Sequence, residues 1–236
     1  MHTVLLRLEG PLQSWGTQSR FEIRDTDTEP SKSGVLGLVG AALGMTRDDE
    51  TRLGELARLR MAVRVDREGT MLRDYHTAGG GRFRGETYGI WQTADNTAGG
   101  KVGGTAPTQR YYLAGASFLV GLEGDQALAQ TIADALANPV WTPFLGRRSC
   151  PAAAPLAAGL VEGALEEVLP ARPFPQRLRP ASDKATPERL RLVRESDTGA
   201  PRNDAPVSFR LYARQHTQRR VEVDWVPMPE IREDAP

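Results

Sequence analysis

Short apolar runs predict four strands and two helices in the first 161 residues of the chain. Runs with strand-like spacing, bounded by glycine, proline or polar residues, cover residues 4–9, 61–66, 111–122 and 155–161. Helical spacing covers residues 34–44, which we expect Ser33 to cap, and residues 125–138, which end before Pro139. The resulting order is strand, helix, strand, strand, helix, strand.

This order is typical of a ferredoxin-like α+β fold, the fold of RNA recognition motif (RRM) domains. Residues 78–109, between the second and third strands, have glycine at nine positions between 79 and 104, which predicts an inserted thumb. Residues 170–206 are rich in proline and arginine, and residues 207–226 alternate well enough for two further strands. We therefore expect an RRM-like domain over 1–170, with its thumb at about 78–109, and a small C-terminal β-rich region over 171–236.

Composition excludes several classes of protein. The single cysteine, Cys150, cannot form an intramolecular disulfide, which is typical of a reducing cytoplasm. Three histidines leave little material for a zinc site, so we expect neither metal nor cofactor. The longest apolar stretch, residues 35–45, spans about half of the ~20 residues that cross a bilayer. We expect a cytoplasmic protein without a membrane segment.

The net charge is zero, but the basic residues are unusual in kind and in place. Of the 30 basic residues 27 are arginine, and residues 170–220 carry 12 basic against 5 acidic side chains. The planar guanidinium fork of arginine suits phosphates and base edges. For the arginine-to-lysine ratio alone, a GC-rich genome is the favoured explanation, whereas the clustering is harder to explain in that way.

The turn after the first strand combines small polar side chains with an aromatic ring. Gln13, Ser14 and Trp15 lie between Gly10 and Gly16. Amides and hydroxyls in such a turn can surround a phosphate, and tryptophan can stack on a base. The alternative is a turn whose Trp15 fills the core.

The start of the first helix is a candidate anion site. Ser31, Lys32, Ser33 and Gly34 place amides, hydroxyls and one cation together. The alternative is an ordinary serine N-cap without a ligand. The spacing of a nucleotide-hydrolysing phosphate loop is absent, so we do not expect such activity.

Tyr75 and His76 are the candidates for catalysis. A titratable histidine beside a tyrosine can support metal-free RNA cleavage through the 2′-hydroxyl. The alternative is a structural histidine at a strand end. The elbow motif of serine hydrolases does not occur.

The thumb and the segment after the second helix offer further cations. The thumb mixes basic and aromatic residues with its glycines, which suits a single-stranded nucleic acid; the alternative is a solvated loop. Arg147 and Arg148 can clamp adjacent phosphates, or one of them can pair with a buried carboxylate. The thumb residues in question are Arg82, Phe83, Arg84, Tyr88, Trp91 and Lys101.

Four sequence blocks in order, residues 8–16, 30–38, 72–77 and 143–151, resemble the CasD family of the RAMP superfamily. They read LEGPLQSWG, PSKSGVLGL, LRDYHT and PFLGRRSCP. The family is the head-end subunit of the type I-E CRISPR Cascade complex. The chain after residue 170 carries no matching motif.

The resemblance implies a non-catalytic RNA-binding subunit of an antiviral ribonucleoprotein. It implies that the protein caps the 5′ handle of the CRISPR RNA (crRNA), contacts the large subunit CasA and the backbone subunit CasC, and meets target DNA only through the complex. A separate endonuclease, CasE, cuts the crRNA, although subunits of another subtype cleave RNA themselves, which keeps Tyr75 and His76 as the alternative. The predicted RNA-binding residues are Gln13, Ser14, Trp15, Arg20, Arg24, Ser31, Lys32, Ser33, Gly34, His76, Arg82, Arg84, Arg110, Arg147 and Arg148.

Overall fold

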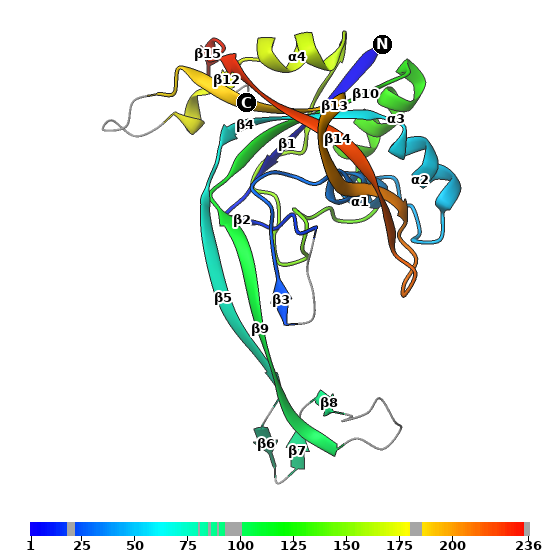
Figure 1. Ribbon diagram of the computed structural model, residues 1–236, viewed down its shortest axis with the longest axis vertical. Helices are drawn as coiled ribbons and strands as arrows, with labels where there is room; N and C mark the ends of the chain where they lie inside the picture. The colour runs from blue at the N-terminus through cyan, green and yellow to red at the C-terminus, as the bar shows by residue number, and fades with distance from the viewer. Residues whose placement is uncertain are drawn as a thin grey trace.

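A six-stranded sheet forms the centre of the molecule (Figure 1). The computed structural model describes residues 1–17, 22–79, 81–84, 86–88, 90–92, 101–179 and 186–233. Every neighbouring pair of strands in this sheet is antiparallel. In spatial order the strands are β11 (Ala157–Glu162), β1 (His2–Glu9), β10 (Ser117–Gly124), β4 (Arg60–Arg67), β13 (Arg189–Ser208) and β14 (Gln215–Pro227).

Helices cover both faces of this sheet. Leu6 of β1 packs in the cluster that contains residues of α1, α2 and α3, whereas Leu5 packs with Leu165 and Leu169 of α4. Because successive side chains of a strand point to opposite faces, a strand buried on both sides reads as a continuous apolar run. The helices are α1 (Lys32–Ala42), α2 (Glu50–Ala57), α3 (Gln126–Ala137) and α4 (Leu165–Ala171), followed by a 3-10 turn (Gln176–Leu178).

The predicted strands and helices of the first 161 residues are present, with two corrections. The run 111–122 is not one strand: it is divided at Gly115, which has a φ of +66° and separates β10 from the strand before it. The cap of α1 is Ser31 and not Ser33, because the Ser31 hydroxyl accepts a hydrogen bond from the Gly34 amide at 3.3 Å. The sequence reading did not predict α2 or α4.

A two-stranded arm projects from the sheet (Figure 1). It consists of β5 (Thr70–Gly79) and β9 (Lys101–Ala114), which pair antiparallel from Thr70 opposite Ala114 to Gly79 opposite Thr105. The paired strands therefore begin well before residue 78, where we expected the thumb to start. Short strands accompany the arm: β2 (Leu12–Gln13), β3 (Ile23–Arg24), β6 (Gly81–Phe83), β7 (Glu86–Tyr88) and β8 (Ile90–Gln92).

The C-terminal part of the chain extends the central sheet. β13 pairs with β4 over residues 191–194, and β14 follows as the edge strand. Of the two strands predicted within 207–226, only β14 lies there; β13 occupies the stretch that reads as rich in proline and arginine. Two short parallel strands, β12 (Phe174–Pro175) and β15 (Ile231–Arg232), complete this part.

Many arginines serve the fold itself. The side chain of Arg64 is fully buried, binds Asp66 at 2.7 Å and donates to the carbonyl of Leu169 at the same distance. It thereby anchors the end of α4 to β4, and its charge is compensated as buried charges require.

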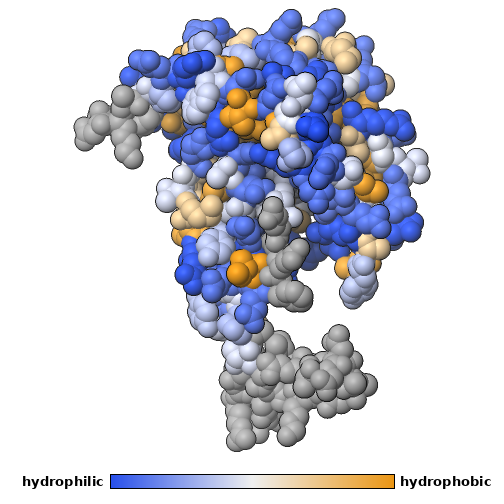
Figure 2. Space-filling view, viewed as in Figure 1, coloured by the Kyte–Doolittle hydropathy of each residue, from blue (hydrophilic) through white to orange (hydrophobic). Residues whose placement is uncertain are grey.

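The described surface is largely hydrophilic on the face that Figure 2 shows. Figure 2 shows hydrophobic residues only in small, separate groups on one face. Among the described residues, no helix is long and apolar enough to cross a membrane.

Candidate nucleic-acid interface

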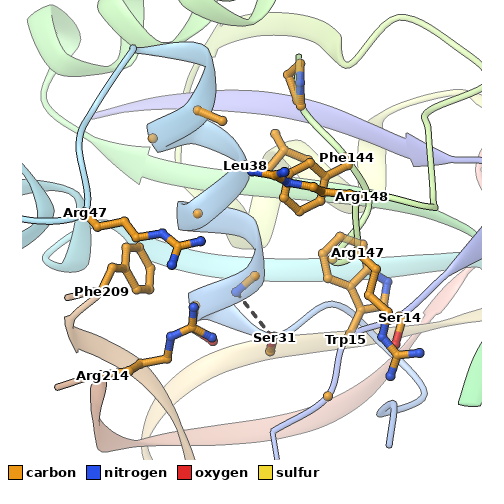
Figure 3. A pocket seen from close by; sticks show the side chains of 18 of the residues that line it. Ser14, Trp15, Ser31, Leu38, Arg47, Phe144, Arg147, Arg148, Phe209 and Arg214 are labelled. Atoms are coloured by element: carbon orange, nitrogen blue, oxygen red, sulfur yellow. Dashed lines mark hydrogen bonds between the residues drawn. The ribbon is translucent and has the colours of Figure 1, made fainter. Parts of the chain in front are cut away.

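A pocket of about 860 Å³ lies over α1 and brings together segments that are distant in sequence (Figure 3). Its walls come from the turn after β1, the start of α1, the segment 141–151 and the end of the β13–β14 hairpin. Eight of the predicted residues line it: Ser14, Trp15, Arg24, Ser31, Ser33, Gly34, Arg147 and Arg148.

Gln13 and Trp15 support the pocket from below. Trp15 is 1% exposed, and its indole nitrogen donates to Gln13 at 3.0 Å. Gln13 is fully buried and donates to the carbonyls of Leu8 and Ala116 at 3.1 and 2.9 Å. The stacking role expected of Trp15 therefore has no exposed ring face, and the alternative of a core tryptophan describes this arrangement.

The anion site expected at the start of α1 already holds an internal carboxylate. Asp204 of β13 accepts a hydrogen bond from the Lys32 amide at 2.8 Å and pairs with Arg219. The Lys32 side chain is buried and pairs with Glu195 at 2.9 Å. Burial lowers the pKa of Lys32, and Glu195 opposes that effect. Lys32 therefore binds the hairpin to α1 and does not face the pocket.

Arg147 is held by the backbone around it. Its guanidinium donates to the carbonyls of Arg24 and Asp25 at 2.7 and 3.3 Å and lies 4.8 Å from the centre of the Tyr112 ring. Within the described residues, the Nη1 atom of Arg147 is buried and has no hydrogen-bond partner. A buried donor without a partner costs free energy of folding. This N–H group is therefore suited to donate a hydrogen bond to an acceptor atom of a ligand.

Gly146 fixes the course of this segment against the turn after β1. It has a φ of +82°, and a Cβ there would lie 1.7 Å from the carbonyl oxygen of Ser14. The Ser14 amide donates to the Leu145 carbonyl at 3.1 Å. Cys150, four residues on, is buried, and that burial raises the pKa of its thiol. The two arginines are therefore presented by a segment with little freedom to move.

The pocket lining includes basic and aromatic residues that the sequence did not predict, among them Arg47, Phe209, Arg214 and His216. Arg47 follows α1, and the other three lie at the end of the β13–β14 hairpin. The basic excess over residues 170–220 was a signal for this hairpin, but no local motif marked it. Burial lowers the pKa of His216 and Arg214 lowers it further, so this imidazole is mainly neutral at pH 7.

The pocket has a pronounced positive character. Its charged lining consists of five arginines and two carboxylates, Asp25 and Asp49, and Asp49 already binds Arg52. Within the described part of the chain, none of the five arginines forms an ion pair with a carboxylate, unlike Arg191 or Arg219. Such cations can bind the phosphates of a nucleic acid without first breaking an internal ion pair. The five are Arg24, Arg47, Arg147, Arg148 and Arg214.

Residues predicted on the arm lie outside the pocket. Tyr75 and His76 are neighbours in β5, so their side chains leave the strand on opposite faces. Tyr75 is 65% exposed, and Arg110 of β9 lies opposite Asp74. The two candidates for RNA cleavage therefore do not converge on one point.

Three further predicted cations do not belong to the pocket as described, and two of them lie wholly or partly outside the description. Arg20 falls outside the described residues. Arg82 lies in β6, and its side chain is not described. Arg84 has a φ of +54° and lies outside the pocket lining.

The fold and pocket define a class: a mixed α/β protein of mostly antiparallel strands, with an arginine-lined pocket and a two-stranded arm. Residues 3–222 match the family described as CRISPR-associated protein (Cas_Cas5). The chain therefore belongs to this family, and the resemblance drawn from the four sequence blocks is confirmed.

Similarity to individual proteins supports the same family assignment. CRISPR system Cascade subunit CasD of Escherichia coli (strain K12) is 39% identical over 168 residues, 66% of this chain and 70% of that protein. A chain of a CRISPR RNA-guided surveillance complex is similar with a TM-score of 0.77 and 38% identity, over 99% of this chain and 94% of that one. A crystal structure of a Cas protein gives 0.70 and 37%, over 97% and 98% of the two chains.

Proposed function

We propose that the chain is a non-catalytic crRNA-binding subunit of a type I-E CRISPR surveillance complex and caps the 5′ handle of the guide RNA. One observation carries this proposal: in this relative of a Cascade subunit, the pocket over α1 is lined by five arginines, none of which forms a carboxylate pair within the described residues. Single-stranded RNA supplies phosphates for these cations. The activity requires no metal and no cofactor.

The proposed RNA site differs in part from the set predicted from sequence. Ser14, Ser31, Ser33, Arg147 and Arg148 remain in it as pocket residues. Gln13 and Lys32 become supporting residues because they do not line the pocket. Trp15 becomes one because its ring, at 1% exposure, has no free face for stacking on a base.

We assign the partners CasA and CasC to surfaces other than the pocket, and target DNA to contact through the assembled complex. The arm supports this division, since Met71, Leu72 and Tyr75 of β5 are exposed on it. Exposed large apolar residues are typical of surfaces that a protein neighbour covers.

We also assign residues 1–170 to a ferredoxin-like, RRM-like domain and residues 171–236 to a C-terminal region. The order β11-β1-β10-β4, with helices before β4 and after β10, supports the first assignment. The C-terminal region contributes β13 and β14 to the same sheet, so we expect it to unfold together with the rest.

The proposal is tested by replacing one exposed pocket arginine in the assembled complex. Arg148→Gln removes a cation without disturbing an internal ion pair. We expect crRNA retention to weaken about ten-fold, the effect of one charge-assisted contact, and its salt dependence to fall by about 0.7 in log–log slope. The measurement is crRNA dissociation from purified complex across a salt series.

Arg58→Gln is the matched control, since Arg58 is exposed and lies outside the pocket. Unchanged retention in the Arg148 variant would count against the proposal. The alternative, a metal-independent endoribonuclease, predicts site-specific cleavage of repeat RNA in EDTA that His76→Ala abolishes.

A further inference from the structure

The pocket has a second basic wall that faces the predicted arginine pair across α1. Figure 3 shows Arg47, Phe209 and Arg214 on one side of this helix and Arg147 and Arg148 on the other. The wall is built from the segment after α1 and from the end of the β13–β14 hairpin.

The second wall is held in place by contacts with α2. These contacts do not use the arginines that line the pocket. Arg210 at the hairpin end pairs with Glu50 of α2 at 3.2 Å, and the Ser208 hydroxyl donates to the same carboxylate at 3.0 Å. Arg47 and Arg214 form no ion pair with a carboxylate among the described residues. One arginine of the hairpin end is therefore structural, while the pocket-lining cations beside it are left for another partner.

A buried charge network holds the hairpin against α1 from below. Asp204 binds the Lys32 amide at 2.8 Å and the Arg219 guanidinium at 2.6 Å, and Lys32 pairs with Glu195. Buried and mutually satisfied groups of this kind fix the relative position of the elements they join. The second wall is consequently in place before any ligand arrives, which lowers the ordering cost of binding.

We propose that this wall is a second RNA subsite, in which Arg47 and Arg214 hold a phosphate and Phe209 packs against the adjoining base or ribose. The inference rests on the proposed function and extends it: the single strand crosses α1 between two arginine pairs, and the C-terminal hairpin is part of the grip. Residues Gly37 and Ala41 line the pocket between the walls, so the helix offers a path with little side-chain bulk.

Charge and shape favour RNA over an acidic protein segment as the occupant. The two basic walls continue into one pocket, so a single chain with regularly spaced anions can reach both. The partly buried Phe209 ring, packed against the core, gives a base or ribose a rigid apolar surface.

The test is the double variant Arg47→Gln/Arg214→Gln in the full-length chain within the purified complex. We expect crRNA to dissociate at least ten-fold faster at fixed salt, with the salt slope reduced by about 0.7 because the two arginines hold one phosphate of a single strand. Arg58→Gln is again the control, and thermal unfolding checks that each variant folds as the parent does.

A second readout uses the unaltered protein. Photocrosslinking of crRNA that contains 4-thiouridine in its handle should give adducts in peptides spanning residues 209–216. Suppose that Arg148→Gln weakens crRNA retention, that the double variant retains crRNA like the parent, and that no crosslink maps to residues 209–216. In that case this inference fails while the proposed function stands. Loss of a protein subunit without faster RNA release would assign the wall to a protein partner and overturn the inference. If neither variant affects RNA, both fall.

Discussion

At the scale of single residues, arginine has two roles in this protein, and the surroundings of each arginine decide which role it has. Arg64 and Arg219 are buried against carboxylates, and they stabilise the fold. Arg148 and Arg214 have no such partner in the described structure and line the pocket. Sequence alone cannot distinguish the two kinds of arginine, because the carboxylates that neutralise the first kind are often distant in the chain.

Gly146 is the residue on which the position of the arginine pair most depends. Gly146→Ala must accommodate both a φ of +82° and a Cβ 1.7 Å from the Ser14 oxygen, so we expect it to destabilise the protein by about 3–5 kcal/mol. Urea unfolding of the purified protein measures this.

Gly115→Ala is the matched control for that substitution. Gly115 also has a positive φ, of +66°, but nothing lies within 4 Å of its added Cβ. Its cost is then the backbone strain alone, about 1–2 kcal/mol. Equal effects of the two substitutions would show that the contact with Ser14 does not determine the course of the segment.

At the scale of elements, α1 combines a structural face with a face open to the pocket. Gly34 is explained by internal packing, since a Cβ there would approach the Trp15 ring to 2.8 Å. At Gly37 the nearest atom would be Phe209 Cζ at 3.9 Å, an ordinary contact, so packing within the chain does not require glycine. A glycine that lowers helix stability without an internal reason is consistent with close approach by a ligand.

Gly37→Ala should therefore stabilise the protein while weakening its hold on RNA. Alanine favours the helix by about 1 kcal/mol, which raises the melting temperature by roughly 2–4 °C in a chain of this size. The added methyl group narrows the path across α1, so we expect faster crRNA release from the complex. Differential scanning fluorimetry and crRNA dissociation measure the two effects.

Gly54→Ala in α2 is the control for Gly37→Ala, because it raises helix propensity at a position outside the pocket. Gly54 is exposed, and nothing lies within 4 Å of an added Cβ. We expect a similar gain in stability with unchanged RNA retention. A Gly37 variant that retains RNA like the parent would remove α1 from the RNA path.

Local patterns predicted elements better than they predicted the site. The strands at residues 4–9 and 61–66 and the helix at 125–138 were found because apolar spacing and caps are local signals. β13 was not predicted because its prolines and arginines obscure the alternation of apolar and polar residues that marks a strand. Its partners, β4 far earlier in the chain and β14 after it, are not visible in the local sequence. In the site, Arg147 and Arg148 came from a motif, whereas Arg47 and Arg214 meet only after folding.

At the scale of the whole molecule, a net charge of zero conceals an uneven distribution. Carboxylates such as Asp66, Asp204 and Glu29 neutralise arginines of the fold, and few remain near the pocket. Within the described residues, the pocket is therefore a place where arginines are concentrated, although the overall charge of the molecule gives no attraction to RNA at long range. We expect much of its affinity for crRNA to depend on the assembled complex.

The most direct measurement is crosslinking of crRNA to this chain in the native complex, followed by mapping of the modified peptides. We expect adducts between 5′-handle nucleotides and peptides that contain residues 141–151, with a second group at residues 209–216. A complex that retains crRNA of uniform 5′ end but gives no adduct in this chain, or adducts only outside the pocket, would contradict it.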